Sequence, residues 1–163
     1  RLANGGKAVM PRLVRPLVQL GETEPPSLGL SPEALQLVLR GMIEVTSLGG
    51  TAYGARITEP GYSMAGKTGT SQVRRITREE RATGVRKNED KPWNERDHAL
   101  FVGWGPIEAP RYACAVVVDH GGGGSSVAAP IARDILLKAM VNDSGRPPVL
   151  PSPRQVPRTT RTV

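Results

Sequence analysis

The chain has 163 residues, of which 38% are hydrophobic and 4% aromatic, and its formal net charge is +7. This length is sufficient for one domain with a real core, and the composition predicts an aliphatic core. Few aromatic side chains could stack on bases, and basic residues alternate with acidic ones through 74–97, which argues against nucleic-acid binding. The single cysteine, Cys114, excludes an internal disulfide and a cysteine-based metal site. No apolar run approaches the roughly 18 residues of a membrane span.

The N-terminal part of the chain is expected to contain one helix. Residues 1–20 open with an Asn-Gly-Gly turn and are interrupted by two prolines, so an extended or edge segment is expected, with a loop over 21–29. Apolar residues then recur at helical spacing over 31–48, with Ser31 as the N-cap and Gly49 at the end. Because the first residue is arginine rather than methionine, we expect the chain to be a piece of a longer protein.

The middle of the chain predicts three strands and a long polar connection. Residues 62–73 alternate loosely after a Pro-Gly pair and are expected to form a strand. Residues 74–97 are highly charged and are expected to form a surface excursion with a short helix at Arg78–Ala82. Strands are expected over 98–105 and 111–119, and the short turn between them predicts an antiparallel hairpin.

The C-terminal part predicts a second helix and a tail. His120 and four glycines form a loop, and a helix is expected over 125–141, capped by Ser125 or Ser126. Residues 142–163 are rich in proline and basic residues, and we expect them to be disordered. The predicted fold class is therefore α/β of the α+β type, a partly antiparallel sheet packed by helices over 1–141.

Residues 59–73, "EPGYSMAGKTGTSQV", satisfy two motifs at once. From Gly61 to Thr68 the spacing is that of a phosphate-binding P-loop, which needs a buried strand before the first glycine and a helix beginning at Gly-Lys-Thr. Pro60 spoils that strand, and the residues after Thr68 are poor helix formers, so the P-loop interpretation is disfavoured.

The other motif is K-T-G-T at Lys67–Thr70, which suits a strand beside a cleft. A lysine there can hold a substrate carboxylate, and the hydroxyls of Thr68 and Thr70 can add hydrogen bonds to it. Gly69 would allow a substrate backbone to approach closely, and the Thr70 N–H could donate to a developing oxyanion. On three residues alone, an ordinary exposed turn would be the better explanation.

The motifs around K-T-G make it specific, because several occur together in a fixed order. This ordered set closely resembles the C-terminal half of the transpeptidase domain of class B penicillin-binding proteins, in particular the elongation-specific group. The resemblance covers roughly residues 1–140. Its members are "ANGG" at 3–6, "GT" at 50–51, "AGKTGTSQ" at 65–72, "HALFVGWGP" at 98–106 and "GGGGSSVAAPIARDIL" at 121–136.

The resemblance implies a serine D,D-transpeptidase that cross-links peptidoglycan stem peptides ending in D-Ala-D-Ala and is acylated by β-lactams. It implies neither a cofactor nor a metal. It places the enzyme at the periplasmic face of the bacterial inner membrane, anchored by an N-terminal helix, with membrane proteins of the elongation machinery as partners. By resemblance, Lys67 and Thr70 are the catalytic residues of this segment, and Lys67, Thr68, Gly69 and Thr70 bind substrate.

The chain departs from the family pattern because it lacks the nucleophile. None of its nine serines is followed three residues later by lysine, and none is followed two residues later by asparagine. The family places both motifs upstream of K-T-G, so the N-terminal remainder of the protein is expected to supply them. A D,D-carboxypeptidase or β-lactamase of the same fold, or a non-catalytic interaction domain, stays open as an alternative.

Other chemistry-bearing residues have simpler explanations. Cys114 is expected to be a small buried residue, and His98 a structural histidine at a strand end. His120 beside Asp119 is expected to be a solvated turn rather than a metal site. Trp93 is expected to pack against the rim of the cleft, and the glycines at 121–124 to need unusual dihedral angles.

Overall fold

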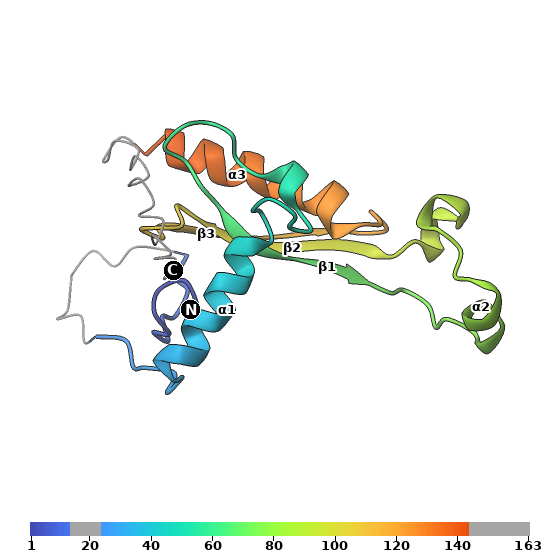
Figure 1. Cartoon of the computed structure of the whole chain (residues 1–163), viewed down its shortest axis with the longest axis horizontal. Helices are drawn as coiled ribbons and strands as arrows, with labels where there is room; N and C mark the ends of the chain where they lie inside the picture. The colour runs from blue at the N-terminus through green and yellow to red at the C-terminus, as the bar shows by residue number, and fades with distance from the viewer. Residues whose placement is uncertain (14–23, 144–163) are drawn as a thin grey trace, which may run out of the picture.

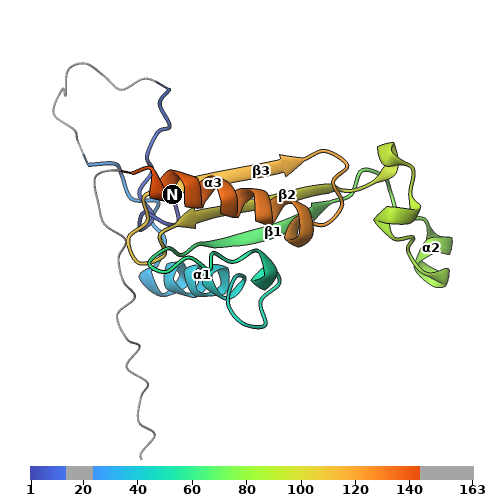
Figure 2. The same ribbon diagram turned by 90° about the horizontal axis from the view of Figure 1, so that it is seen from above.

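The computed structural model describes residues 1–13 and 24–143. Its centre is a three-stranded antiparallel sheet in the order β1-β2-β3, formed by β1 (Ala65–Ser71), β2 (His98–Gly105) and β3 (Tyr112–Val118). The helix α3 (Ala129–Val141) runs along one face of the sheet over β2 and β3, and α1 (Pro32–Glu44) lies beside β1 (Figures 1 and 2). The α+β fold class is thereby confirmed, and every strand pairing is antiparallel.

The core lies between α3 and the sheet. Phe101 of β2 and Leu136 of α3 are its largest fully buried side chains, and Ala99, Ala129 and Ala132 are also excluded from solvent. The expectation of an aliphatic core was incomplete, because the only phenylalanine of the chain stands at its centre. The small residues around Phe101 allow α3 to pack closely against the strands.

The helix α1 is shorter than the 31–48 predicted. It is capped as expected, since the Ser31 hydroxyl accepts the Ala34 N–H at 3.1 Å. It ends at Glu44 because Thr46 donates its hydroxyl to the carbonyl of Met64 at 2.7 Å, which draws the chain toward the start of β1. No residue of α1 is buried in the described part of the chain.

The strand predicted over 62–73 is also shorter. At its start, Ser63 accepts the Ile107 N–H at 2.9 Å and donates to Glu108, so it is tied to the β2–β3 turn instead of the ladder. At its end, Arg74 turns toward Glu80 on α2 (Arg78–Thr83). The short helix predicted in the excursion is confirmed, and the excursion projects beyond the end of the sheet (Figures 1 and 2).

The cap predicted for the last helix was wrong. A one-turn π-helix, η4 (Gly124–Ala128), precedes α3, and neither Ser125 nor Ser126 caps it. The Ser126 hydroxyl instead donates to the Gly123 carbonyl, inside the turn. The expectation about the four glycines holds only for Gly122, which has a φ of 86°.

Little regular structure precedes α1 in the described residues. The Asn-Gly-Gly turn is present, with the Asn4 side chain accepting the Lys7 N–H at 3.0 Å. The expected extended segment amounts to one isolated bridge between Lys7 and Ser27. Residues 14–23 lie outside the described residues, and so does the tail predicted to be disordered over 142–163, except for 142 and 143.

Candidate active site

The K-T-G-T motif lies in the middle of β1. Lys67, Thr68, Gly69 and Thr70 pair in turn with Val102, Phe101, Leu100 and Ala99 of β2. No helix begins after Thr68, because the chain continues as strand to Ser71. The P-loop interpretation is therefore excluded, since its phosphate site requires the N-terminus of a helix at that point.

The two sides of β1 carry different parts of the motif. Side chains alternate along a strand, so Lys67 and Gly69 lie on one face while Thr68 and Thr70 lie on the face that carries Phe101 and Ala99. Lysine and threonines therefore do not meet on a common face. A group that both are to contact must lie along the edge of the strand, where it can be reached from either face.

That edge of β1 is free. Within the described residues β1 pairs with β2 alone. The exposed Lys67 ammonium donates to the carbonyl oxygen of Thr68 at 2.8 Å, which indicates that this carbonyl points away from β2. Alternate residues of an antiparallel strand direct their peptide groups to the same side, so the Thr70 N–H also points to the free edge.

The ammonium group of Lys67 is available to form an ion pair with a negatively charged group of a ligand. Among the described residues, no carboxylate lies within ion-pair distance of its Nζ atom. Within the part of the chain that the structure describes, its ammonium forms one hydrogen bond, to the carbonyl oxygen of Thr68. An unpaired ammonium next to an open strand edge can accept a carboxylate without first breaking an internal ion pair.

Gly66 has a packing role. A Cβ atom there would collide with the ring of Phe101 and would lie 2.5 Å from the carbonyl oxygen of Val102. Gly103, the pairing partner of Gly66, would bring its own Cβ to 2.6 Å from the same ring. Gly103 was not predicted from the sequence, although the alternating pattern of its strand could have indicated it.

The two histidines form a structural cluster. His98 Nδ1 accepts the backbone N–H of His120 at 2.9 Å, and His120 Nδ1 lies 3.0 Å from the Arg96 carbonyl. This holds His120 at a φ of 54°, which non-glycine residues rarely adopt. The described residues contain no group of three potential metal ligands of the His, Cys, Asp or Glu type.

Trp93 and Cys114 differ in part from expectation. Trp93 is 64% exposed, and its ring lies 4.4 Å from the ring of His120 rather than being enclosed. Cys114 is only partly buried at the edge of the core, and burial raises the pKa of its thiol. A thiol with a raised pKa is a poor nucleophile, which agrees with an inert role.

The charged excursion is ordered by its own polar contacts. Arg74 donates to both carboxylate oxygens of Glu80, at 2.9 and 2.5 Å, and Thr77 and Glu80 form a reciprocal capping box. The Arg74 guanidinium, followed by the Thr77 backbone N–H, lowers the pKa of Glu80 to about 2. Farther along, Lys91 and Asp97 form a buried ion pair with both oxygens 3.3–3.4 Å from the ammonium.

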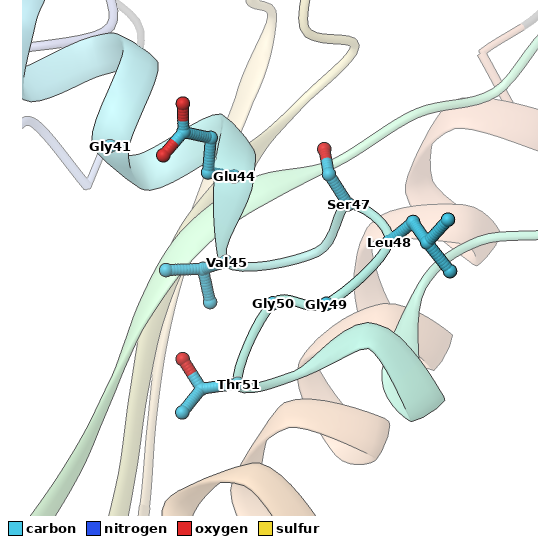
Figure 3. Close-up of a pocket in the computed structure, with 8 residues that line it drawn as sticks. All are labelled: Gly41, Glu44, Val45, Ser47, Leu48, Gly49, Gly50 and Thr51. Atoms are coloured by element: carbon cyan, nitrogen blue, oxygen red, sulfur yellow. The ribbon is translucent and has the colours of Figure 1, made fainter.

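An open pocket lies at the end of α1, apart from the K-T-G-T motif. Its volume is about 580 Å³, and it is lined by residues of 41–51. Figure 3 shows the side chains of Glu44 and Ser47 pointing to the same side, while Leu48 points away. None of Lys67, Thr68, Gly69 or Thr70 lines it, so this pocket is not the site that the motif predicts.

An antiparallel sheet with a helix on one face and K-T-G on an accessible strand is the arrangement expected of penicillin-binding proteins and serine β-lactamases. The model of the penicillin binding protein transpeptidase domain matches residues 1–137, so the chain belongs to this family. It is 31% identical over 146 residues to the peptidoglycan D,D-transpeptidase MrdA of Haemophilus influenzae, covering 83% of this chain and 21% of that protein. It is 39% identical over 120 residues to MrdA of Acinetobacter baumannii, covering 71% of this chain and 16% of that protein.

Solved structures of penicillin-binding proteins resemble the fold of this chain. The chain resembles Pseudomonas aeruginosa PBP2 in complex with WCK 5153, with a TM-score of 0.63, 32% identity and coverage of 93% of this chain and 30% of that one. It also resembles PBP2 of Helicobacter pylori in its complex with MreC, with a TM-score of 0.53, 28% identity and coverage of 74% and 21%. The resemblance to class B penicillin-binding proteins of the elongation-specific group is thereby confirmed. The chain spans only about a fifth of the length of the curated relatives.

Within the described residues, no helix has both the length and the apolar character needed to cross a membrane.

Proposed function

We propose that the protein containing this chain is a peptidoglycan D,D-transpeptidase and that this chain supplies the substrate-binding wall of its active site. The observation that carries the proposal is the K-T-G-T motif on β1, an edge strand with an unpaired lysine. An extended stem peptide ending in D-Ala-D-Ala fits such an edge, because main-chain groups can pair with it as an added strand.

Each residue of the motif has a role in this proposal. Lys67 and the hydroxyls of Thr68 and Thr70 hold the terminal carboxylate of the peptide from the two faces of the strand. The Thr70 N–H, directed to the free edge, donates to the oxygen that becomes negative when the D-Ala carbonyl is attacked. Gly69 keeps the strand free of a side chain where the peptide backbone passes.

The nucleophile of the reaction is a serine in the N-terminal remainder of the protein. The serine attacks the penultimate D-Ala carbonyl, the terminal D-Ala leaves with a proton, and an amine of a second stem peptide attacks the acyl-enzyme and releases the serine. β-Lactams would acylate the same serine. The 163-residue segment alone is expected to be inactive, since none of its serines lies in an S-x-x-K motif.

The test is acylation of the complete protein by a fluorescent penicillin. Replacing Lys67 with alanine should lower the second-order rate of labelling by about 10- to 100-fold, the range for losing a hydrogen bond to a charged group. Lys138 of α3 offers a matched lysine outside the motif, and Lys138→Ala should label at the wild-type rate. If the Lys67 variant and the wild type were labelled at equal rates, the K-T-G-T motif would not be part of the active site.

A hydrolase of the same fold is the second candidate. A D,D-carboxypeptidase or β-lactamase would release the acyl group to water, whereas a transpeptidase would keep the label for many minutes without an acceptor amine. The decay of the label after removal of free penicillin separates the two reactions. An interaction domain without catalysis would show no labelling of the complete protein.

The cellular setting is proposed on the same basis. We place the protein at the periplasmic face of the inner membrane, anchored by an N-terminal helix outside this chain, with residues 1–141 in the transpeptidase domain. The MreC complex of the H. pylori relative supports a partner from the elongation machinery. Protease digestion of spheroplasts, compared with intact cells, would test the location.

A further inference from the structure

Three glycines precede η4 and a fourth, Gly124, begins it, and an added side chain would meet different surroundings at each of the four. Gly122 adopts a positive φ, a Cβ at Gly121 would press on Val118, and a Cβ at Gly123 would approach only the rotatable hydroxyl of Ser126 at 2.8 Å. Gly124 alone faces the K-T-G-T strand. A Cβ there would collide with the carbonyl oxygen of Gly69 and would lie 2.9 Å from the Gly69 nitrogen.

Because Gly124 has no side chain, the backbone of η4 packs directly against the backbone of β1 at Gly69, in the K-T-G-T motif. The same added Cβ would lie 2.5 Å from the carbonyl oxygen of Leu100, the residue that pairs with Gly69 in the ladder. Contacts this short do not occur between real atoms, so either η4 or the strands would have to move.

The movement would fall on β1 rather than on η4. Ala128 of η4 and Ala129 after it are fully buried, and the Val127 N–H donates to the Gly123 carbonyl at 3.0 Å, so the turn is held in place. β2 is held by a ladder on each side, whereas β1 has one neighbour in the described part of the chain and lies at the margin of the sheet (Figure 2). The edge strand is the part that can yield.

We propose that Gly124 is a positioning residue for acyl transfer, because its contact with Gly69 fixes how far the K-T-G-T strand stands from the core and so places the Thr70 N–H. This inference rests on the proposed function. A π-helical turn in this position fits it, since such turns recur at functional sites. Displacement of a catalytic group by about 1 Å can cost about 100-fold in rate.

The experiment compares wild-type complete protein with Gly124→Ala and Gly123→Ala. A fluorescent penicillin is used at increasing concentration, and the limiting acylation rate, the concentration for half of that rate and the final labelled fraction are measured separately. Gly124→Ala should lower the limiting rate by about 10- to 100-fold in the molecules that label. Gly123→Ala should stay within about twofold of wild type, because its neighbour can rotate away.

A merely structural role predicts a different pattern. Destabilisation would lower the labelled fraction and leave the limiting rate of the remaining molecules unchanged, and that result would overturn the inference. If circular dichroism shows that Gly124→Ala does not fold, the limiting rate is measured in Val127→Ala instead. This variant weakens the packing of η4 against the core. A wild-type limiting rate in that variant overturns the inference, and a lowered rate supports it. If the wild-type protein itself does not label, the proposed function fails and the inference fails with it.

Discussion

The ring of Phe101 lies where a side chain on Gly66 would have to be. The two residues are on neighbouring strands, Phe101 pairing with the residue two positions after Gly66, and a Cβ at Gly66 would overlap the ring. Gly66 directly precedes Lys67 on β1, so the residue that makes room for the fully buried ring of Phe101 is the neighbour of the first residue of the K-T-G-T motif. Core packing and the position of the candidate site are therefore coupled at this point.

Replacing Gly66 with alanine should destabilise the complete protein by about 1–3 kcal/mol, the usual cost of overpacking a close-packed core. Denaturant unfolding measures the change. Gly54 is the matched control, because a Cβ there meets nothing within 4 Å and its φ is not positive. A Gly66 variant as stable as the Gly54 variant would show that Phe101 can move aside.

Replacing Thr46 with valine should cost about 1–3 kcal/mol, because the buried carbonyl of Met64 loses its donor while the shape of the side chain is kept. Thr46→Ser keeps the hydroxyl and should be closer to wild type. Chemical denaturation of the two variants checks this. Equal stability of the valine and serine variants would mean that the hydrogen bond contributes nothing to the end of α1.

The ring of His98 should accept a hydrogen bond at Nδ1 and carry its proton on Nε2. Its Nδ1 accepts the His120 N–H, and a proton on Nδ1 would remove that bond, although Asp119 lies 3.5 Å away. Nitrogen chemical shifts of the His98 ring report the tautomer directly. His98→Ala should destabilise by about 0.5–1.5 kcal/mol, and His98→Asn should recover part of this through its side-chain oxygen. A proton found on Nδ1 would contradict the acceptor role.

The excursion should lose order in acid. The pKa of Glu80 falls from 4.5 to about 2 in the folded chain, so its ion pair with Arg74 stabilises fully above pH 4.5. This contribution is lost as the pH falls from 4.5 toward 2. Hydrogen exchange of the α2 amides should show the wild type better protected than Glu80→Gln at neutral pH, with the difference vanishing near pH 2. A difference that is independent of pH would exclude the carboxylate as the cause.

The isolated 163-residue chain should not unfold cooperatively. No residue of α1 is buried, and Leu37 and Val38 are exposed on it, while β1 has no second neighbouring strand among the residues that the structure describes. Exposed apolar helix faces and unpaired strand edges leave too little burial to offset the entropy of ordering. Calorimetry of the segment should give a broad transition, and a single sharp one would contradict this prediction.

The sequence by itself determined the local elements and the motif. Caps, glycines and alternation located α1, α2 and the hairpin, with β2 at its predicted bounds of 98–105. Lys67–Thr70 was placed on a strand because residues 62–73 alternate loosely after a Pro-Gly pair, and the poor helix formers after Thr68 disfavoured a P-loop. The order of the flanking motifs was sufficient to indicate the family.

Only the tertiary structure decided where α1 ends and how the turn before α3 is built, because both depend on residues distant in the chain. α1 stops early because Thr46 finds Met64, and the serines predicted as caps became part of a π-turn because Gly124 packs on Gly69. Local pattern cannot predict these outcomes, since each is set by a contact between residues that lie 18 or more positions apart.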